Sequence, residues 1–473
     1  FSVPSLFSLK QGYRFQVFQM TTRICVNVSS ALNSNARGWV CVSRLTVGRQ
    51  RAIRAKKNSP RNHVQPTTAS ATNIETDNAV QDISTSALEF TDHFYEWKAG
   101  YQCHYTCLRN GMTERQDPAA ALVLLPGFGV GTFHFEAVMQ ELVTLDPDAP
   151  VYALDWFGQG KSWPTEDPAP SIEPSLVGGF EWGFGTEAAP LYKDLTYSLD
   201  MWTAQLEYFL DNHMPEHHGV CKAVLAGNSL GGFIAANLAA QRPDLVEGLV
   251  FLNATPFWGA NRAYLPLWKG SLPIPTTIQS IAALWWNSIR TTETITAMLD
   301  FVYAGKSYDK SIITNIQAPT QHPASAAAFC SILFSLPPAL SFDEMLLRIR
   351  DNGTPVLLCY GKDDPWVVPA WGQKAKRDLG DSCLYFEVSP SGHCPHHETP
   401  QPVAFLLNRF CTALTRRVEG EALNWDSMGI GGSSIQFGEA SLEYLARGAP
   451  RNFFEKLAYG VYCVEKYVLR KRA

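Results

Sequence analysis

Five continuous apolar runs, each of strand length, constrain the fold of this chain more than any other feature. They are ALVLLPG (121–127), PVYALDW (150–156), KAVLAG (222–227), VEGLVFLN (246–253) and TPVLLCYG (354–361). Such runs are typical of strands buried on both faces, as strands of parallel sheets are. CLYFEVS (383–389) adds a strand, and YQCHYTCL (101–108) alternates as an exposed antiparallel strand does. Because helical patterns lie between the runs, notably over 191–213 and 231–241, we expect an α/β fold, a mostly parallel sheet flanked by helices.

One interval interrupts this alternation of strands and helices. Between 253 and 354 the sequence has helical patterns but no strand-like run. We therefore expect a helical cap insertion at about 257–345 within one α/β domain at 92–415. The segment 318–342 contains no charged residue but four prolines, so it is not expected to span a membrane.

The two ends of the chain differ in composition from this domain. Residues 1–74 contain no Asp or Glu but eleven Lys or Arg, which is typical of an organellar transit peptide, so 1–85 is interpreted as leader and linker. The extension 416–473 carries an apolar stripe at helical spacing that ends in basic residues: Phe454, Leu457, Val461, Val464 and Val468. This amphipathic helix either packs on its own domain or lies on an anionic membrane.

The motif G-x-S-x-G joins one buried run to the helix that follows. Gly227, Ser229 and Gly231 stand between KAVLAG and the alanine-rich helix. In a nucleophile elbow the serine adopts a strained positive φ above the end of the sheet, and tiny residues are needed two positions before and after it. Ser229 is therefore the predicted nucleophile, and an ordinary glycine-rich turn is the alternative.

A serine hydroxyl needs a base and an orienting acid, and the sequence offers both in the order Ser, acid, His. Asp364 follows the run 354–361, with Asp363 as the alternative acid. His393 follows the strand 383–389 and is the predicted base. The alternatives are His396 or His397 as the base, and a zinc site made by these three histidines with Cys394. Glu398 is interpreted as a cap of the following helix.

An oxyanion hole requires two backbone N–H donors. Leu230 follows the nucleophile, and Phe128 stands between two glycines after the run 121–127. We expect these two residues to supply the donors. No metal and no cofactor is expected, because acyl transfer to water by this triad requires neither.

Aromatic content and charge restrict the substrate class. The net charge of −5 and the pI near 6.1 argue against nucleic acid as a partner. Aromatic side chains crowd the cap and its neighbouring loops, which predicts a large hydrophobic substrate. The residues expected to contact it are Trp182, Phe257, Trp258 and Trp366.

Seven motifs lie between about 94 and 414: LPGFGVGTFHFE, LDWFGQGKSWPTEDP, GNSLGGFIAANLAA, LNATPFWG, TQHPASAAAF, YGKDDPWVVPAWG and GHCPHHETP. Together they resemble the pheophytinase family, plastid α/β-hydrolases that remove phytol from pheophytin. The resemblance implies catalytic roles for Ser229, Asp364 and His393, and a hydrophobic pigment ester as substrate. It also implies a place in the chloroplast stroma and a part in chlorophyll breakdown. Peripheral contact with the thylakoid membrane is a separate expectation.

Two rival functions remain open from the sequence. Water and a second alcohol compete for the same acyl-enzyme, so another lipid esterase or an acyltransferase on this scaffold is one alternative. A non-catalytic binding module on a hydrolase fold is the other, although such modules usually lack part of the triad.

Overall fold

The structure, a computed structural model, describes residues 90–108, 121–147, 149–171, 182–256, 268–304, 308–416, 428 and 434–445. These residues belong to one compact unit, Ile83–Ala473. The predicted leader and linker, the predicted C-terminal amphipathic helix, and Phe257 and Trp258 lie outside the described residues.

The described strands form one 11-stranded sheet, in the order β1-β2-β4-β3-β6-β7-β8-β9-β11-β10, with β5 paired to β2. The six strands from β4 to β9 along this order are parallel, and those at the two edges are antiparallel. The predicted mostly parallel α/β fold is confirmed. The strands are β1 Phe90–Lys98, β2 Tyr101–Leu108, β3 Ala121–Leu125, β4 Val151–Leu154, β5 Trp163–Pro164, β6 Ala223–Asn228, β7 Val246–Leu252, β8 Val356–Gly361, β9 Cys383–Ser389, β10 Ser434–Phe437 and β11 Ala440–Tyr444.

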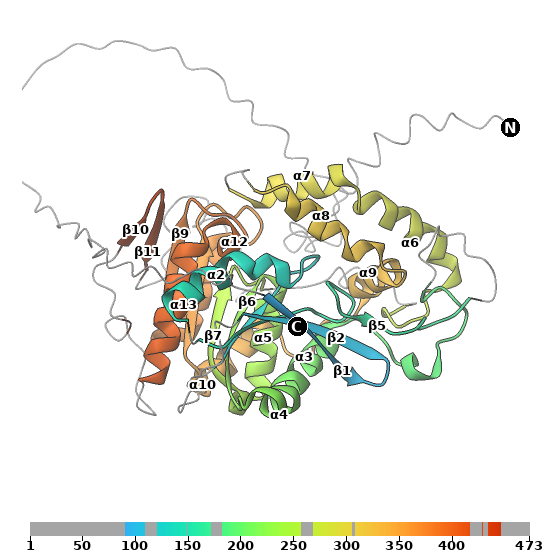
Figure 1. The fold of residues 1–473 in the computed structure, drawn as a ribbon, viewed down its shortest axis with the longest axis horizontal. Coiled ribbons are helices and arrows are strands. Elements are labelled where there is room, and N and C mark those ends of the chain that lie inside the picture. Colours follow the sequence, from blue (N-terminus) through green and yellow to red (C-terminus); the bar gives the residue numbers. More distant parts are fainter. Residues whose placement is uncertain are drawn as a thin grey trace, which may run out of the picture. The chain divides into compact units, whose positions relative to one another are not determined.

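Two hydrophobic cores, one on each face of the sheet, explain the unbroken apolar runs. In β3, Val123 and Leu125 enter one core while Leu122 and Leu124 enter the other, as the period of two dictates. The first core is covered by α3 (Leu199–Tyr208), α5 (Leu230–Gln241), α10 (Phe342–Asp351) and α11 (Pro369–Leu379). The second is covered by α2 (Glu136–Leu145) and α13 (Pro400–Thr415), which pack together (Figure 1).

Two local expectations were wrong. Strand β2 is buried at every residue except Gln102, because it lies between β1 and β4 rather than at an edge. The helix expected over 191–213 begins only at Leu199, where the Ser198 side chain accepts a hydrogen bond from the N–H of Met201 and caps it. It continues through a π-helical turn, Phe209–His213, into α4 (Met214–His218).

The cap consists of the helices α6 (Thr276–Ile289), α7 (Thr292–Val302), α8 (Ser311–Gln317) and α9 (Ser325–Phe334). Figure 1 shows them gathered on one side of the sheet. Helix α10 begins inside the expected interval 257–345 but packs on α5 in the first core, where Phe342 stacks on Phe233. No helix in the described parts of the chain is long and apolar enough to cross a membrane.

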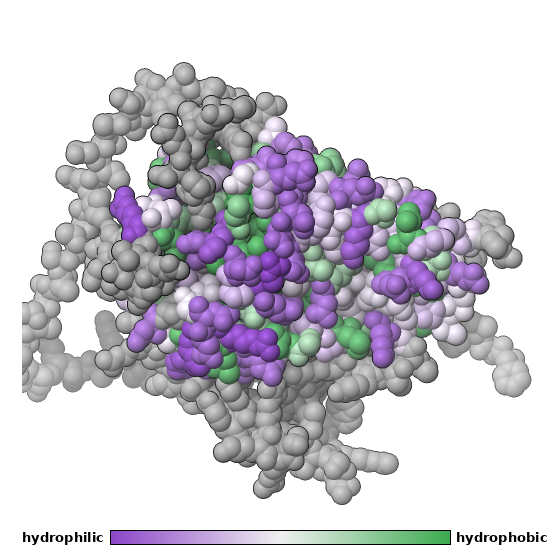
Figure 2. Space-filling view, turned by 90° about the horizontal axis from the view of Figure 1, so that it is seen from below, coloured by the Kyte–Doolittle hydropathy of each residue, from purple (hydrophilic) through white to green (hydrophobic). Residues whose placement is uncertain are grey.

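One face of the molecule is mostly polar. On the face seen in Figure 2, hydrophilic side chains dominate and hydrophobic ones are scattered, as on most water-exposed protein surfaces. The cap differs in composition, because α6 contains no charged residue.

Candidate active site

The strand-to-helix corner at Ser229 has the geometry of a nucleophile elbow. Ser229 connects β6 to α5 with φ +50° and ψ −113°, and it is partly exposed between buried neighbours. A Cβ at Gly227 would lie 2.3 Å from the Gly232 nitrogen, and a Cβ at Gly231 would lie 2.1 Å from the Leu125 carbonyl oxygen. The expected positive φ and the need for tiny flanking residues are therefore confirmed.

The two neighbouring aspartates after β8 have different environments. Asp363 is exposed, whereas Asp364 is 3% exposed. Oδ1 of Asp364 accepts hydrogen bonds from the N–H groups of Trp366 (2.7 Å) and Val367 (3.0 Å). Its Oδ2 lies 2.7 Å from Nδ1 of His393. The structure thus brings Asp364, and not Asp363, to the predicted base.

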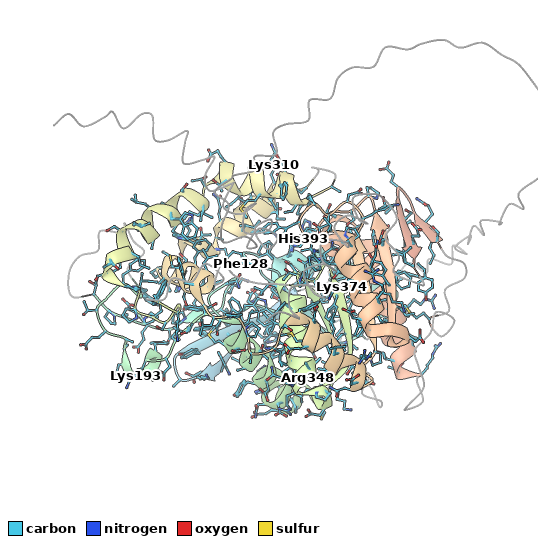
Figure 3. The ribbon with its side chains drawn as sticks, turned by 180° about the vertical axis from the view of Figure 1, so that it is seen from behind. Phe128, Lys193, Lys310, Arg348, Lys374 and His393 are labelled. Carbon is cyan, nitrogen blue, oxygen red and sulfur yellow. The ribbon has the colours of Figure 1, made fainter. Side chains whose placement is uncertain are left out.

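His393 lies in the loop after β9, and hydrogen bonds hold both its backbone N–H and its backbone carbonyl. Its N–H donates to the Val302 carbonyl at the end of α7 (2.9 Å), and its carbonyl accepts from Nδ2 of Asn228 (3.0 Å), next to Ser229. The imidazole stacks on Trp366 with ring centroids 5.8 Å apart. No described residue forms a hydrogen bond with Nε2, so this nitrogen is available to a nucleophile. Figure 3 labels the position of His393 in the fold.

Glu398 joins the base loop to the cap instead of capping the following helix. Its carboxylate accepts hydrogen bonds from the N–H groups of Gly392 (2.9 Å), Cys394 (3.1 Å) and Ala304 (2.8 Å). Helix α13 has no side-chain cap. Burial raises the pKa of Glu398, although these three donors oppose that rise. The carboxylate connects the loop of His393 to the cap segment Val302–Ala304.

His396 and His397, the alternative bases, belong to a separate buried cluster. Nε2 of His396 lies 3.0 Å from Nδ1 of His134, and the hydroxyl of Tyr303 lies between His134 (2.9 Å) and His397 (3.2 Å). Burial lowers the pKa of all three histidines, for His134 and His396 well below its ordinary value. Within the described residues no His, Cys, Asp and Glu side chains form a group that could hold a metal ion, so the zinc alternative finds no support.

The loop after β3 passes directly beside the serine. A Cβ at Gly127 would lie 3.4 Å from Cβ of Ser229. Phe128 follows, and Leu230 is the first residue of α5, where backbone N–H groups lack helical partners. Both predicted oxyanion donors therefore flank Ser229, at the positive end of the helix. The phenyl ring of Phe128 packs against Phe329 of α9 (6.0 Å).

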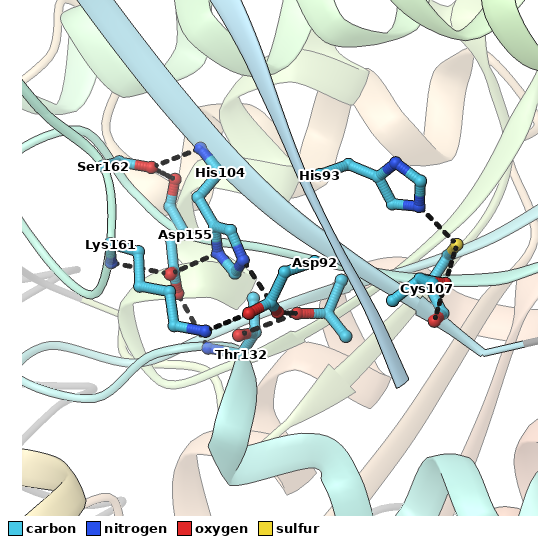
Figure 4. A network of polar contacts seen from close by, with 10 residues as sticks. Asp92, His93, His104, Cys107, Thr132, Asp155, Lys161 and Ser162 are labelled. Atoms are coloured by element: carbon cyan, nitrogen blue, oxygen red, sulfur yellow. Dashed lines mark hydrogen bonds and ion pairs between the residues drawn. The ribbon is translucent and has the colours of Figure 1, made fainter. Parts of the chain in front are cut away.

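A network of polar contacts, shown in Figure 4, also holds the loop after β3. Oδ1 of Asp155, just after β4, accepts from the N–H of Thr132 (2.7 Å), and its Oδ2 lies 2.8 Å from Nδ1 of His104. Nε2 of His104 lies 3.0 Å from Asp92, which also pairs with Lys161. Sequence reasoning missed this network, although Asp155 stands at the carboxyl end of a parallel strand, where functional groups collect.

Comparison with known proteins identifies the family. The sequence matches the alpha/beta hydrolase family over residues 122–404. The chain belongs to this family. It is 40% identical to the chloroplastic pheophytinase of Arabidopsis thaliana over 324 residues, which cover 66% of this chain and 64% of that protein. It is 22% identical to the human (lyso)-N-acylphosphatidylethanolamine lipase, over 49% of this chain and 70% of that one. The enol-lactonase of Burkholderia xenovorans aligns with TM-score 0.46 at 17% identity, over 67% of this chain and 99% of that one.

The aromatic residues of this alpha/beta hydrolase divide into two groups. Trp366 lies at the site, against His393, and Trp285 and Trp286 of α6 contact Phe329, which reaches Phe128. Trp182 instead meets the ring of His322 (5.3 Å). The residue that brings the cap to the oxyanion loop is therefore Phe329.

Asn253 is the main residue of this family member that sequence reasoning missed. It directly follows β7, and its Nδ2 donates to Oδ2 of Asp364 (2.7 Å). The available signal was its position in LNATPFWG, a polar residue at the carboxyl end of a strand next to the acid's strand.

Proposed function

We propose that the protein is a serine carboxylic-ester hydrolase that removes phytol from pheophytin to give pheophorbide, in chlorophyll breakdown in the chloroplast. The observation that carries the proposal is the 2.7 Å contact between Asp364 and His393, with His393 fixed by the residue next to the strained Ser229. The similarity to the Arabidopsis pheophytinase supports the choice of substrate. That similarity and the acid-free segment 1–74 support the location.

The proposed mechanism gives each residue one step. Nε2 of His393 takes the hydroxyl proton of Ser229 while Oγ of Ser229 attacks the ester carbonyl. The N–H groups of Phe128 and Leu230 stabilise the oxyanion that forms. The imidazolium returns the proton to the oxygen of phytol, which leaves, and the pheophorbide acyl group stays on Ser229. Water, activated by His393, then hydrolyses the acyl-enzyme. Asp364 holds Nδ1–H of His393 and stabilises the imidazolium throughout.

The apolar cap suits a long-chain ester. A phytyl group of about twenty carbons carries roughly 15 kcal/mol of transfer free energy at ~0.8 kcal/mol per methylene. A protein that takes such a group out of a membrane must offer apolar surface of similar extent. Phe128 and Trp285, both partly exposed and both in ring contact with the buried Phe329, contribute such surface near the serine.

Peripheral contact with the thylakoid membrane forms part of the proposal. Helix α6 exposes Ile281 (66%) and Leu284 (74%), and α7 exposes Met298 and Phe301. Exposed apolar side chains on an uncharged helix favour insertion at a lipid surface. Ile281→Glu with Leu284→Glu should reduce flotation with liposomes. Leu145→Glu, a change at an exposed leucine of α2, is the matched control and should leave flotation unchanged.

A substrate panel tests the activity. The purified protein is incubated in detergent with pheophytin, magnesium chlorophyll or a long-chain acylglycerol, each with and without an added alcohol, and Ser229→Ala is the blank. Serine-dependent release of phytol from pheophytin, with little or none from chlorophyll, is the expected result. Cleavage of the acylglycerol without cleavage of pheophytin would refute the substrate and leave a lipid esterase. Transfer to the alcohol in preference to water would identify an acyltransferase.

A further inference from the structure

Asn253 has a backbone conformation that asparagine adopts only at some cost. Its φ is +47°, and among the described residues the only other non-glycine residue with positive φ is Ser229. Asn253 is completely buried. Residues kept in this region cluster at functional sites, where other contacts offset the strain. The side chain of Asn253 provides such contacts.

The orientation of the Asn253 amide follows from its partners. Oδ1 accepts a hydrogen bond from the N–H of Gly361 at the end of β8 (2.8 Å). Since a backbone N–H can only donate, this contact fixes which side of the amide is oxygen. Nδ2 therefore points the other way, and it donates to Oδ2 of Asp364 (2.7 Å).

Asn253 and His393 share one carboxylate oxygen. Oδ2 of Asp364 receives both Nδ2 of Asn253 and Nδ1 of His393, each at 2.7 Å, while Oδ1 receives two backbone N–H groups. With four donors the carboxylate cannot rotate about its Cβ–Cγ bond without losing hydrogen bonds. A second donor on Oδ2 also withdraws negative charge from the oxygen that faces the imidazole.

We infer that Asn253 is a positioning residue for the catalytic acid, which holds Oδ2 of Asp364 in line with His393 and limits how strongly that oxygen stabilises the imidazolium. The inference rests on the proposed serine mechanism. Asn253 acts through Asp364 and does not touch the substrate. Its removal should lower turnover more than substrate binding and move the acidic limb of the pH profile of Ser229 labelling to higher pH, because a less satisfied carboxylate attracts the protonated ring more strongly.

Other titratable groups surround Asp364, so they enter the interpretation of a pH profile. Tyr360 on β8, Cys394 in the base loop and Glu398 on α12 (Pro395–Glu398) all interact with it electrostatically. Burial raises the pKa of each of the three. They stay unchanged in the variants below and therefore contribute equally to every profile compared.

Two substitutions test the inference. Asn253→Gly removes the amide and relieves the positive φ, so the chain retains a backbone it can adopt. Asn253→Asp keeps size and shape but places a second carboxyl group against Asp364. The matched control is Asn237→Asp in α5, an equally buried amide that donates to the hydroxyl of Thr203 (2.9 Å) instead.

The readouts are the rate of Ser229 labelling by a fluorophosphonate from pH 5 to 9, kcat and KM for a short-chain p-nitrophenyl ester, and the thermal midpoint. We expect Asn253→Gly to lower kcat about 10- to 100-fold, the usual effect of losing a hydrogen bond to a charged group, with KM nearly unchanged. The acidic limb of the labelling profile should move to higher pH. Asn253→Asp should show a larger loss, and Asn237→Asp neither effect.

The outcomes separate this inference from the proposed function. A folded Asn253→Gly protein with the kcat and the pH profile of the wild type would overturn the inference. So would an Asn253→Gly protein whose acidic limb does not move and whose loss of kcat is no larger than that of the Asn237→Asp control. A wild-type protein whose Ser229 is not labelled would refute the inference together with the serine mechanism. Labelling and the expected shift without pheophytin cleavage would uphold the inference and refute only the proposed substrate.

Discussion

Two buried histidines of this protein each place Nδ1 against an aspartate, and the two contacts are almost the same length. His393 lies 2.7 Å from Asp364, and His104 lies 2.8 Å from Asp155. The other ring nitrogens differ. Nε2 of His104 is held by Asp92 at 3.0 Å, whereas no described residue bonds Nε2 of His393.

This difference separates a structural pair, His104 with Asp155, from the proposed catalytic pair, His393 with Asp364. His104 joins β1, β2 and the loop after β4, and through Asp155 it supports the loop that carries Phe128. Both of its nitrogens are occupied, so it has none left for a proton transfer. A histidine–carboxylate contact therefore does not identify a general base, and the free second nitrogen is the more informative sign.

The largest expected effect concerns the base itself. His393→Gln should reduce ester turnover by about a millionfold, because triad members act as a unit. The thermal midpoint should change little, since the substitution leaves the backbone contacts with Val302 and Asn228 in place. Turnover and thermal unfolding are measured on the same sample. A loss below a hundredfold would assign the base to another residue.

The acid should matter next, and only at one of two neighbouring positions. Asp364→Asn should lower kcat about 10⁴-fold, because an amide holds the wrong tautomer of His393. Asp363→Asn is the control and should stay within about twofold, as exposed substitutions away from the reaction do. If the two variants rank in the opposite order in steady-state kinetics, the assignment of the acid is wrong.

Substitution in the structural pair, His104 with Asp155, should lower stability more than activity. His104→Leu leaves Asp155 buried without its partner, which should lower the free energy of unfolding by about 3 kcal/mol. The folded fraction should still be labelled at Ser229 by a fluorophosphonate, with a rate reduced about tenfold or less because the Phe128 loop is less firmly held. Urea unfolding and active-site titration measure the two quantities. Complete loss of labelling in folded protein would give His104 a catalytic part.

The smallest effect comes from three histidines whose hydrogen bonds in the described structure go to one another and to Tyr303. Burial lowers the pKa of His134, His396 and His397, whereas an unfolded histidine titrates near 6.5. The unfolded state therefore binds more protons below pH 6.5, and the free energy of unfolding falls as the pH decreases from there. His396→Gln should reduce this slope by up to about 1.4 kcal/mol per pH unit. Thermal midpoints between pH 7.5 and 5 test this, and an unchanged slope would contradict it.

Much of the architecture could be predicted because the information is local. An unbroken apolar run such as 354–361 indicates a strand buried on both faces. The loops after the parallel strands then place Ser229, Asp364 and His393 together at the carboxyl ends of these strands. What sequence reasoning missed depends on pairing between distant segments. The burial of β2 follows from its position beside β4, and β10 and β11 extend the sheet only because β11 pairs with β9.

The polar partners of the site were missed for the same reason. Asn253 and His104 each act through contacts across more than fifty positions of the chain, so no local pattern marks them. The aromatic residues show a related limit. Composition predicts that the cap is aromatic, but only packing selects Phe329 over Trp182 as the neighbour of the oxyanion loop.

The link between Val302 and His393 has a consequence for how this protein can vary. The carbonyl of Val302, which fixes the backbone of His393, belongs to the cap insertion, and the N–H groups of Ala304 and Gly392 donate to the same carboxylate of Glu398. Insertion and catalytic loop are therefore not independent modules. Exchange of the whole insertion for that of a relative would therefore also alter the contacts that hold His393 in place.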